Sequence, residues 1–590
     1  MEMRDFVKNV LACLLAMVVF GLVVGFIAVG AILGMLVSGG TGSVADESVM
    51  VINLSGSVEE RESDNIWDGW LTEEANVTGL DRILGSIESA KSNDKVKGIY
   101  LRAGIITSID PASAKAIRRK LEEFRSAGKW IVSYGDSYSQ MSYYICSVAD
   151  KVMVNPEGIV DWHGISSRPI FLKELLERLG IKVQLAKVGK YKSAPEMLTA
   201  DGMSEANREQ VTAYIKGIWS MMKEDVSESR GISTGDLDGL ADAYMAFSSP
   251  EKYIESRLAD TLVYESEVKG IINGFLGRDA DEEISKTGMD AVLAEASEDQ
   301  GDGVIAVCYA SGEIEDSRIS GIGSGEESID MIEFTECLGS LADDDNVKAV
   351  VLRVNSPGGS AYASEQIWHA VDELKQRKPV VVSMGGYAAS GGYYISCGAD
   401  YIISEPATLT GSIGIYGMFP DFGGLLRDKL GIGFDVVKTN RMSDLGDMSR
   451  PINADERRLL EAYVERGYGL FRRRVAEGRG LPEDSVEQLA QGRVWLGSDA
   501  LEKGLVDSLG SLDDAIRKAA LLAGVKSYRT EVYPEQASWV DQLFGGFEED
   551  AISEGLREWL GTYWEPVSTI AALRRQSGIR ARLPFVLLTK

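Results

Sequence analysis

The hydrophobic pattern divides the chain into one long apolar run and a large body of alternating short and long patterns. Residues 10–37 form the long run, and none of these 28 residues is charged. Because roughly 20 apolar residues suffice to cross the hydrocarbon core of a bilayer, the run predicts a transmembrane helix that can tilt. A cleaved signal peptide is the alternative, but its apolar region is usually shorter, about 7–15 residues.

The charges on either side of this run predict its orientation. Arg4 and Lys8 precede the run, whereas Asp46 and Glu47 follow it. Basic residues favour the cytoplasmic side of a membrane, so we expect a cytoplasmic N-terminus and an extracytoplasmic body. No second apolar run of spanning length follows. The sequence therefore predicts a single-pass protein that contacts the bilayer through residues 10–37.

In the body, short β-branched runs alternate with amphipathic stretches. Residues 349–354 and 379–384 predict buried strands, and residues 364–376 between them predict an amphipathic helix. A strand, a helix and a strand in this order imply a parallel βαβ unit with a right-handed crossover. The fold class is therefore predicted to be α/β.

The body contains an internal repeat. Residues 96–102 (VKGIYLR) recur as residues 347–353 (VKAVVLR), and the Tyr-Tyr-Ile of residues 143–145 recurs at residues 393–395. Several blocks at a nearly constant offset indicate a duplicated unit. The polar, acidic residues 280–302 fit a linker. We therefore expect four parts. These are a cytoplasmic N-terminus with the anchor (residues 1–45), a first domain that includes the acidic linker (residues 46–300), a second domain (residues 301–535) and a C-terminal tail (residues 536–590).

Composition excludes several function classes. The formal net charge of −29 argues against nucleic-acid binding, which needs a basic surface to replace phosphate counterions. The five cysteines include no CxxC pair, so neither a zinc site nor a disulfide framework is expected. Only two histidines, His163 and His369, are available as a base or a metal ligand. We expect no metal and no cofactor.

Two glycine-rich turns in the second copy carry candidate chemistry. The strand at residues 349–354 leads into Ser-Pro-Gly-Gly (356–359), and the next strand leads into Ala-Ser-Gly-Gly-Tyr (389–393). The carboxyl ends of parallel strands meet at one crevice, where glycines let backbone N–H groups approach a ligand. Ser390, at a helix start, is expected to be exposed and to face an oxyanion hole. Glycine content alone also fits two tight turns without catalysis.

These motifs closely resemble the signal peptide peptidase A (protease IV) family, peptidase family S49, in its long tandem-domain form. The resemblance includes three further motifs, Leu-Thr-Gly-Ser-Ile-Gly, Val-Gly-Lys-Tyr-Lys-Ser-Ala and Gly-Arg-Val-Trp, at residues 409–414, 188–194 and 492–495. It implies two tandem ClpP/crotonase-like domains and a membrane-anchored serine endopeptidase that degrades hydrophobic peptides such as cleaved signal peptides. It also implies a homotetramer in the bacterial inner membrane, with the catalytic domains in the periplasm.

The resemblance assigns roles to individual residues. Ser390 matches the nucleophile, Lys192 the general base and Ser412 the hydroxyl that orients the lysine. Backbone donors of the oxyanion hole are expected at three glycines: Gly358, Gly359 and Gly391.

The repeat adds an independent argument for a composite site. In the first copy Gln140 occupies the position of Ser390, and in the second copy a residue near Ser443 occupies the position of Lys192. The first copy thus lacks the serine that the second copy has, and the second copy lacks the lysine that the first copy has. A free lysine has a pKa of about 10.4, so Lys192 can act as a base only if burial lowers that value. The alternative is a solvated loop lysine, as expected for Lys190.

Two other function classes are the alternatives to a protease for this sequence. A crotonase-like enzyme acting on acyl-CoA uses similar glycine turns, but it requires neither the serine between Ala-Ala and Gly-Gly nor a membrane span. A non-catalytic scaffold of the stomatin-partner type does not require both Ser390 and Lys192. The tail after residue 535 ends in basic residues. It is expected either to pack on a neighbouring subunit or to cover the catalytic chamber.

Overall fold

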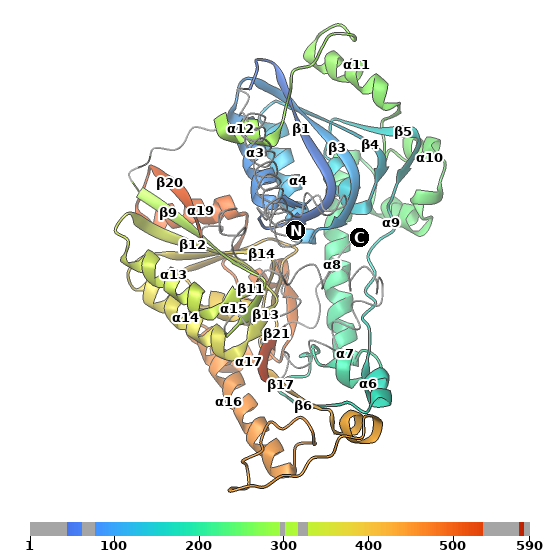
Figure 1. Cartoon of the computed structure of the whole chain (residues 1–590). Coiled ribbons are helices and arrows are strands. Elements are labelled where there is room, and N and C mark those ends of the chain that lie inside the picture. The colour runs from blue at the N-terminus through green and yellow to red at the C-terminus, as the bar shows by residue number, and fades with distance from the viewer. Residues whose placement is uncertain are drawn as a thin grey trace, which may run out of the picture.

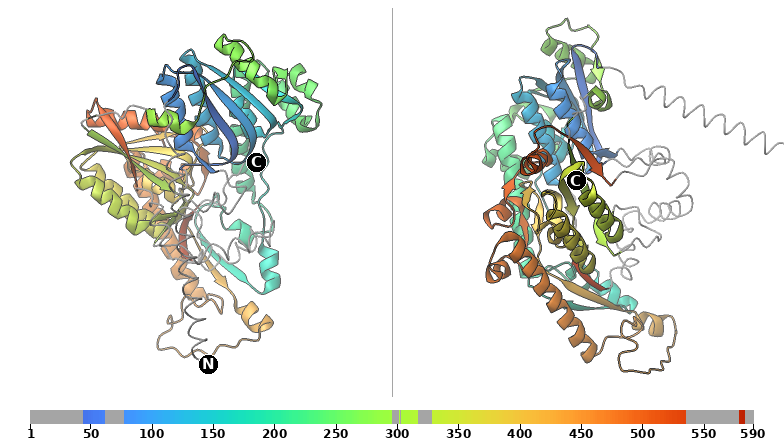
Figure 2. Two further views of the ribbon diagram at one scale, coloured as in Figure 1. Left: turned by 45° about the horizontal axis from the view of Figure 1, so that its top comes forward. Right: turned by 90° about the vertical axis from the view of Figure 1, so that its left-hand side faces the viewer.

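The chain folds into two α/β units joined by a third, smaller sheet (Figure 1, Figure 2). The computed structural model describes residues 44–61, 77–295, 301, 303–316, 328–534 and 578–582. Each unit buries a hydrophobic core between its sheet and the helices that cover the sheet.

The first unit is built on a parallel sheet with the strand order β2-β1-β3-β4-β5-β7, in which β2 (Val77–Gly79) and β7 (Thr261–Leu262) are the short outer strands. Its central strands are rich in Val, Ile and Tyr, and their side chains are mostly buried. Helices connect them as the sequence pattern predicts. The main elements in chain order are β1 (Ser48–Glu59), α3 (Leu80–Ser92), β3 (Val96–Ser108), α4 (Pro111–Ser126), β4 (Trp130–Tyr138), α5 (Gln140–Cys146) and β5 (Lys151–Val160).

The second unit repeats this arrangement with the strand order β18-β16-β14-β12-β9-β20, which includes the further strands β16 (Leu409–Gly411), β18 (Val494–Leu496) and β20 (Tyr528–Tyr533). The predicted strands and the predicted helix are confirmed within a few residues, although β14 extends to Ala389, directly before Ser390. The corresponding elements are β9 (Gly303–Ser311), α13 (Met331–Asp343), β12 (Val347–Ser356), α14 (Ala361–Lys375), β14 (Val380–Ala389), α15 (Gly391–Ser396) and β15 (Tyr401–Ser404).

Details of hydrogen bonding also repeat between the two units. The Tyr143 hydroxyl donates to the carbonyl of Leu258, and the Tyr393 hydroxyl donates in the same way to the carbonyl of Leu505. The 26-residue helix α8 (Glu205–Arg230) likewise has a counterpart of the same length, α16 (Ala454–Arg479). The structure therefore supports the duplication read from the sequence.

A third sheet joins the two units near the carboxyl ends of their strands. Its order is β11-β10-β13-β21-β17-β6. Four of these strands are β10 (Glu313–Glu315), β11 (Ser328–Asp330), β13 (Gly358–Ser360) and β21 (Gly578–Arg582). Strand β6 (Lys182–Lys187) belongs to the first copy and pairs antiparallel with β17 (Tyr416–Asp421) of the second. This pairing carries the chain that follows β6 across to the second unit.

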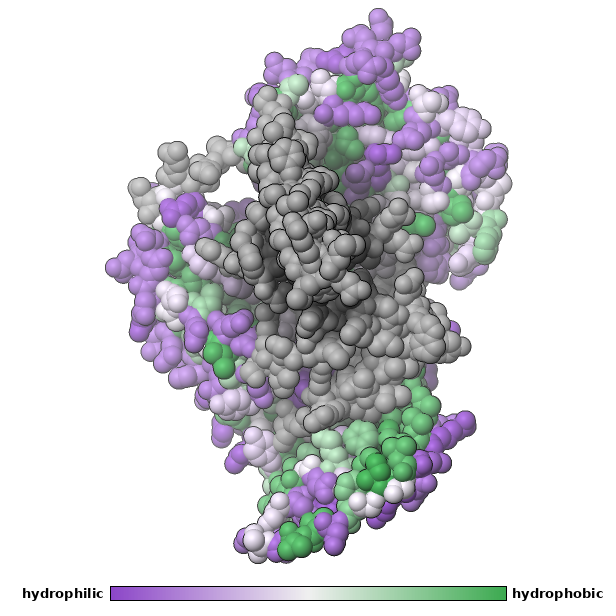
Figure 3. All heavy atoms as spheres, in the orientation of Figure 1, coloured by the Kyte–Doolittle hydropathy of each residue, from purple (hydrophilic) through white to green (hydrophobic). Residues whose placement is uncertain are grey.

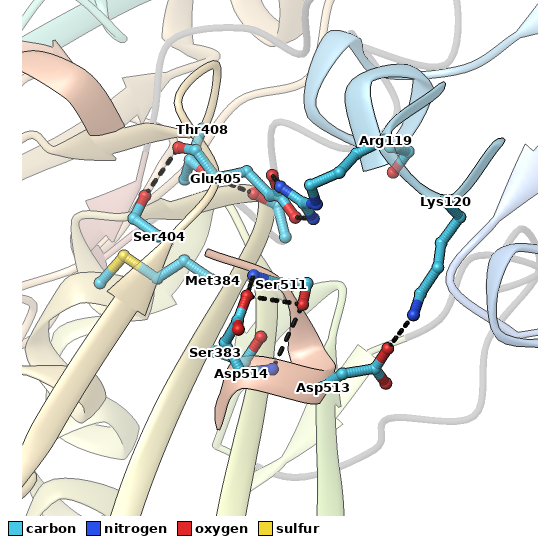
Figure 4. Close-up of polar contacts among 12 residues, drawn as sticks. Arg119, Lys120, Ser383, Met384, Ser404, Glu405, Thr408, Ser511, Asp513 and Asp514 are labelled. Atoms are coloured by element: carbon cyan, nitrogen blue, oxygen red, sulfur yellow. Dashed lines mark hydrogen bonds and ion pairs between the residues drawn. The ribbon is translucent and has the colours of Figure 1, made fainter. Parts of the chain in front are cut away.

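Ion pairs, each with at least one buried partner, fix the two units to each other. Arg119 on α4 forms two hydrogen bonds with Glu405, and its neighbour Lys120 pairs with Asp513 on α19 (Leu512–Ala523) (Figure 4). A further ion pair joins Glu60 to Arg353, and both side chains are only 4 % exposed. Because a buried charge without its partner is costly, these pairs strongly favour one relative position of the units.

The predicted membrane helix and the predicted linker differ in how far the structure describes them. The predicted membrane helix, residues 10–37, lies outside the described residues, and none of the described helices has the length and hydropathy of a membrane span. The predicted linker, residues 280–302, contains more structure than expected. Strand β8 (Lys286–Thr287) pairs with β1, and helix α12 (Met289–Glu295) buries Val292 in the first core. A single buried side chain in a polar stretch leaves little periodic signal.

Candidate active site

Ser390 lies at the junction of β14 and α15, in a backbone conformation that is rare for serine. Its φ is 56° and its ψ is −112°, outside the well-populated regions for non-glycine residues. The Ser390 amide donates to the carbonyl of Gly411 over 2.8 Å, which helps to hold this conformation. Such strain concentrates at functional sites. Contrary to the sequence prediction of an exposed serine, Ser390 is completely buried.

Lys192 reaches Ser390 from the other copy. It lies in the loop between β6 and α7 (Glu196–Thr199), and its Nζ is 2.7 Å from Oγ of Ser390. The same nitrogen lies 3.1 Å from both Oγ and the carbonyl oxygen of Ser412. The structure therefore brings together the three side chains that the sequence singled out, although Lys192 is 198 residues from Ser390 and 220 residues from Ser412 in the chain.

The three partners of the Lys192 nitrogen can all be satisfied by a neutral amine as well as by an ammonium. A neutral amine has two N–H donors and one lone pair, whereas an ammonium has three donors and no acceptor. The Ser412 carbonyl and hydroxyl oxygens can each accept one N–H bond. The lone pair is then left for the hydroxyl proton of Ser390. Ser412 thus turns the free electron pair of the amine toward the serine.

Burial supplies the reason for a neutral lysine. The Lys192 side chain is 0 % exposed. Desolvation is the cause that lowers the pKa of Lys192 well below the ordinary value of a lysine. A base is active above its pKa, so this shift makes the neutral amine available at pH values where a solvated lysine is charged.

The three candidate oxyanion glycines lie together beside Ser390. A Cβ added to Gly391 would lie 3.0 Å from Cα of Gly358 and 3.1 Å from N of Gly359. The Gly358 amide donates to Oγ of Ser356, so it is already engaged. Gly391 is the first residue of α15, and its N–H has no acceptor within that helix. The Gly391 and Gly359 amides are therefore the better candidates for oxyanion donors.

The loop that carries Lys192 is fixed to the second unit by its backbone. The Tyr191 amide donates to the carbonyl of Gln491 over 2.9 Å. Gly492 follows directly, and a Cβ there would lie 2.6 Å from both N and Cβ of Lys192. Gly492 also has a φ of +78°, which favours glycine. This close approach explains the glycine of the Gly-Arg-Val-Trp motif, whose role sequence reasoning did not identify.

Gln210 on α8 provides a second connection that sequence reasoning missed. Its amide nitrogen donates to the Tyr191 carbonyl and to Oγ of Ser193, and its amide oxygen accepts from the Val494 amide. Gln210 is buried. It thereby joins the residues on both sides of Lys192 to the second unit. No motif marks it, because a single glutamine in a long amphipathic helix carries no signal of its own.

Gln140 and Ser443, which occupy the positions of Ser390 and Lys192 in the other copy, have different surroundings from those two residues. Gln140 is buried, and its side-chain oxygen accepts from the amides of His163 and Gly164, so it stabilises a turn of the first unit. Ser443 lies in an exposed turn. His369 is mostly exposed on α14, beside Glu373.

The contact between Gly492 and Lys192 gives a first prediction. Gly492→Ala should slow the reaction of Ser390 with a serine-directed acylating probe by about tenfold or more, since the added Cβ must displace the lysine backbone (1.4 kcal/mol corresponds to tenfold). Gly480→Ala is the matched control. Gly480 has a similar φ of +63°, but the space around it is open. Equal labelling rates for the two variants would contradict this role of Gly492.

Comparison with known proteins agrees with this geometry. Sequence profiles match the chain for Peptidase family S49 (residues 123–271 and 372–526) and for Clp protease (residues 314–406). Protease 4 of Salmonella typhi is 34 % identical over 528 residues, which cover 85 % of this chain and 83 % of that protein. Protease 4 of Haemophilus influenzae is 33 % identical over 551 residues, 89 % and 88 % of the two chains.

A more distant relative extends this match beyond bacteria. The chloroplastic serine protease SPPA of Arabidopsis thaliana is 29 % identical over 493 residues, which cover 81 % of this chain and 69 % of that protein. The two S49 matches fall in the two copies of the repeat, in agreement with tandem ClpP-like domains. The chain therefore belongs to peptidase family S49 and is a serine protease.

Proposed function

We propose that this protein is a membrane-anchored endopeptidase with a Ser390–Lys192 dyad that degrades hydrophobic peptides, such as signal peptides left in the bilayer after cleavage. The observation that carries the proposal is the 2.7 Å contact between Nζ of Lys192 and Oγ of Ser390. Both side chains are fully buried, and burial lowers the pKa of the amine, which favours its neutral form beside the hydroxyl that it would deprotonate.

The mechanism follows from the hydrogen bonds of the site. Neutral Lys192 takes the hydroxyl proton as Oγ of Ser390 attacks the peptide carbonyl. The Gly391 and Gly359 amides stabilise the negative charge that develops on the carbonyl oxygen. The lysine then gives its proton to the leaving amine. In the second half, Lys192 deprotonates the water that attacks the acyl-enzyme, and the proton returns to Ser390.

The proposed substrate class rests on apolar features at one end of the molecule and at the N-terminus. The uncharged run at residues 10–37 would hold the site beside the bilayer, where cleaved signal peptides remain. Hydrophobic side chains also gather at the end of the molecule formed by α6 (Lys173–Leu179) and the segment that follows η2 (Leu425–Lys429) (Figure 3). The exposed ones include Leu175, Leu430, Phe434 and Val437.

The repeat suggests how copies of the chain would assemble. Within the chain, β6 of the first unit pairs with β17 of the second. The counterpart of β6 in the second copy is residues 433–438, which are exposed and unpaired in this single chain, and the counterpart of β17 in the first copy is residues 166–171. If these segments pair between chains, the contact is head-to-tail, and such contacts form a ring when the rotation between neighbours closes. We propose a homotetramer.

The dyad gives the second prediction. Lys192→Ala and Lys192→Arg should each lower kcat for a hydrophobic peptide at least about 10²–10⁴-fold, because neither side chain can accept the serine proton. Ser390→Ala should be equally inactive, and the double variant should be scarcely worse than either single one. Kinetics would be measured alongside melting temperatures.

Lys190→Ala is the matched control for this prediction. Lys190 is exposed and contacts the ring of Tyr191, so its loss removes a positive charge from the same loop without touching the dyad. It should keep most of the activity. Near-normal hydrolysis by a folded Lys192→Ala variant would mean that another base is used.

The third prediction concerns topology. In spheroplasts, protease added from outside should digest the body of the protein, whereas the residues before the apolar run should stay protected. Antibody tags before residue 10 and within an exposed turn of the first unit, such as residues 279–283, would report on the two sides of the membrane. Protection of both tags would contradict the proposed orientation.

The fourth prediction concerns assembly. In detergent, the full chain should scatter light as a homo-oligomer, and Val437→Glu should shift it toward the monomer, since Val437 is 98 % exposed in the single chain. Leu521→Glu is the control, because Leu521 is also 72 % exposed but lies on α19, away from the proposed contact. An unchanged mass for Val437→Glu would argue against this interface.

A further inference from the structure

A short strand from the C-terminal tail lies inside the sheet that joins the two units. Strand β21 (Gly578–Arg582) pairs antiparallel with β13 (Gly358–Ser360) on one side and with β17 on the other (Figure 1). It is the strand that connects β11-β10-β13 to β17-β6. The C-terminal tail, which was expected either to pack on a neighbouring subunit or to cover the catalytic chamber, thus supplies a strand to this sheet.

The neighbours of β21 are the elements of the candidate active site. Strand β13 carries Gly358 and Gly359, and β6, beyond β17, leads to Lys192. In register, Gly359 lies opposite Ala581. A Cβ built on Gly358 would lie 2.1 Å from the carbonyl oxygen of Ala581 and 2.7 Å from the Gly391 amide nitrogen. A peptide carbonyl of β21 therefore lies beside the glycines assigned to the oxyanion hole.

The side chains of β21 are also held specifically. Ala581 is 0 % exposed and belongs to the core of the second unit. The arginines on either side of it both pair with Glu313 on β10 (Glu313–Glu315): Arg580 at 2.5 Å and Arg582 at 3.1 Å. Glu313 is 22 % exposed, so this contact is only partly screened by water. The groove thus combines a site for a small side chain with one acidic group.

A peptide substrate would need to bind at the edge of β13 that β21 occupies. Extended peptides commonly bind by adding a strand to a free sheet edge, where backbone hydrogen bonds give affinity and side-chain sites give specificity. Beside the oxyanion glycines, the edge of β13 is the edge that a scissile peptide would use, and β21 occupies it. Two strands cannot pair with the same edge at once.

We propose that β21 is a built-in competitor that occupies the substrate groove and is anchored there by Glu313. The proposal rests on the proposed protease function and adds regulation and specificity to it. A substrate binds only when β21 leaves, and hydrophobic peptides with a small side chain at the position of Ala581 bind in its place. A tethered competitor reduces the fraction of binding-competent enzyme, so it raises KM and leaves kcat unchanged.

The test uses the full chain in detergent with a neutral hydrophobic peptide substrate. Arg580→Gln combined with Arg582→Gln removes both ion pairs to Glu313, and should lower KM by roughly 3- to 10-fold at unchanged kcat, since that factor equals the gain in competent fraction. Labelling of Ser390 by an acylating probe should speed up by a similar factor. Arg529→Gln is the control, because Arg529 pairs with Glu531 on β20 (Tyr528–Tyr533), outside the groove.

A second measurement does not depend on how the double variant folds. The capped peptide Gly-Ile-Arg-Ala-Arg should inhibit the wild-type chain competitively, and Glu313→Gln should reduce the difference in inhibition between this peptide and the capped peptide Gly-Ile-Gln-Ala-Gln. The peptide Gly-Ile-Gln-Ala-Gln should inhibit less. Glu336→Gln, an exposed substitution on α13, should change nothing.

The outcomes separate the two proposals. If hydrolysis and labelling depend on Ser390 and Lys192, but the double variant keeps the wild-type KM or the peptide does not inhibit, the role of β21 is overturned and the protease mechanism stands. If hydrolysis survives in Lys192→Ala, the proposed dyad fails, whatever β21 does.

Discussion

Removal of one amine from water is the constraint on which the rest of the site depends. A lysine can deprotonate a serine only while it is neutral, and desolvation is what lowers the pKa of Lys192. Because no compensating acid takes part in that shift, the lysine has to be enclosed completely. Its side chain is 0 % exposed, between the loop after β6, the turn at Ser412 and the backbone of Gly492.

Such an enclosure needs two surfaces that do not move apart. The first copy supplies the lysine and the second supplies the serine, so any separation of the units would hydrate the amine and restore its charge. The buried pair of Glu60 and Arg353 and the pair of Arg119 and Glu405 hold the units together. The pairing of β6 with β17 aligns the loop that carries Lys192. Duplication thus provided two similar surfaces, and each could lose the half of the site that the other retained.

Much of this arrangement could be predicted from the sequence, and the reasons are specific. The β-branched runs and the constant offset of the repeat predicted the α/β units, because local pattern and duplication are visible in the residues themselves. Ser390, Lys192 and Ser412 were found through their motifs. Gln210 was not, because its role arises only when α8 packs against the second unit. The burial of Ser390 and the insertion of β21 also depend on contacts between distant segments, which no local pattern records.

The central claim is that burial holds Lys192 neutral beside Ser390, and the pH dependence of Ser390 acylation tests it most directly. The rate of labelling by a neutral acylating probe would be followed in the wild-type chain over the range in which the protein stays folded. A lowered pKa for Lys192 predicts a rate that rises with pH, with a midpoint well below the value of about 10.4 for a free lysine, and no such rise in Lys192→Ala. A midpoint near that of a free lysine, or the same profile in Lys192→Ala, would contradict the account.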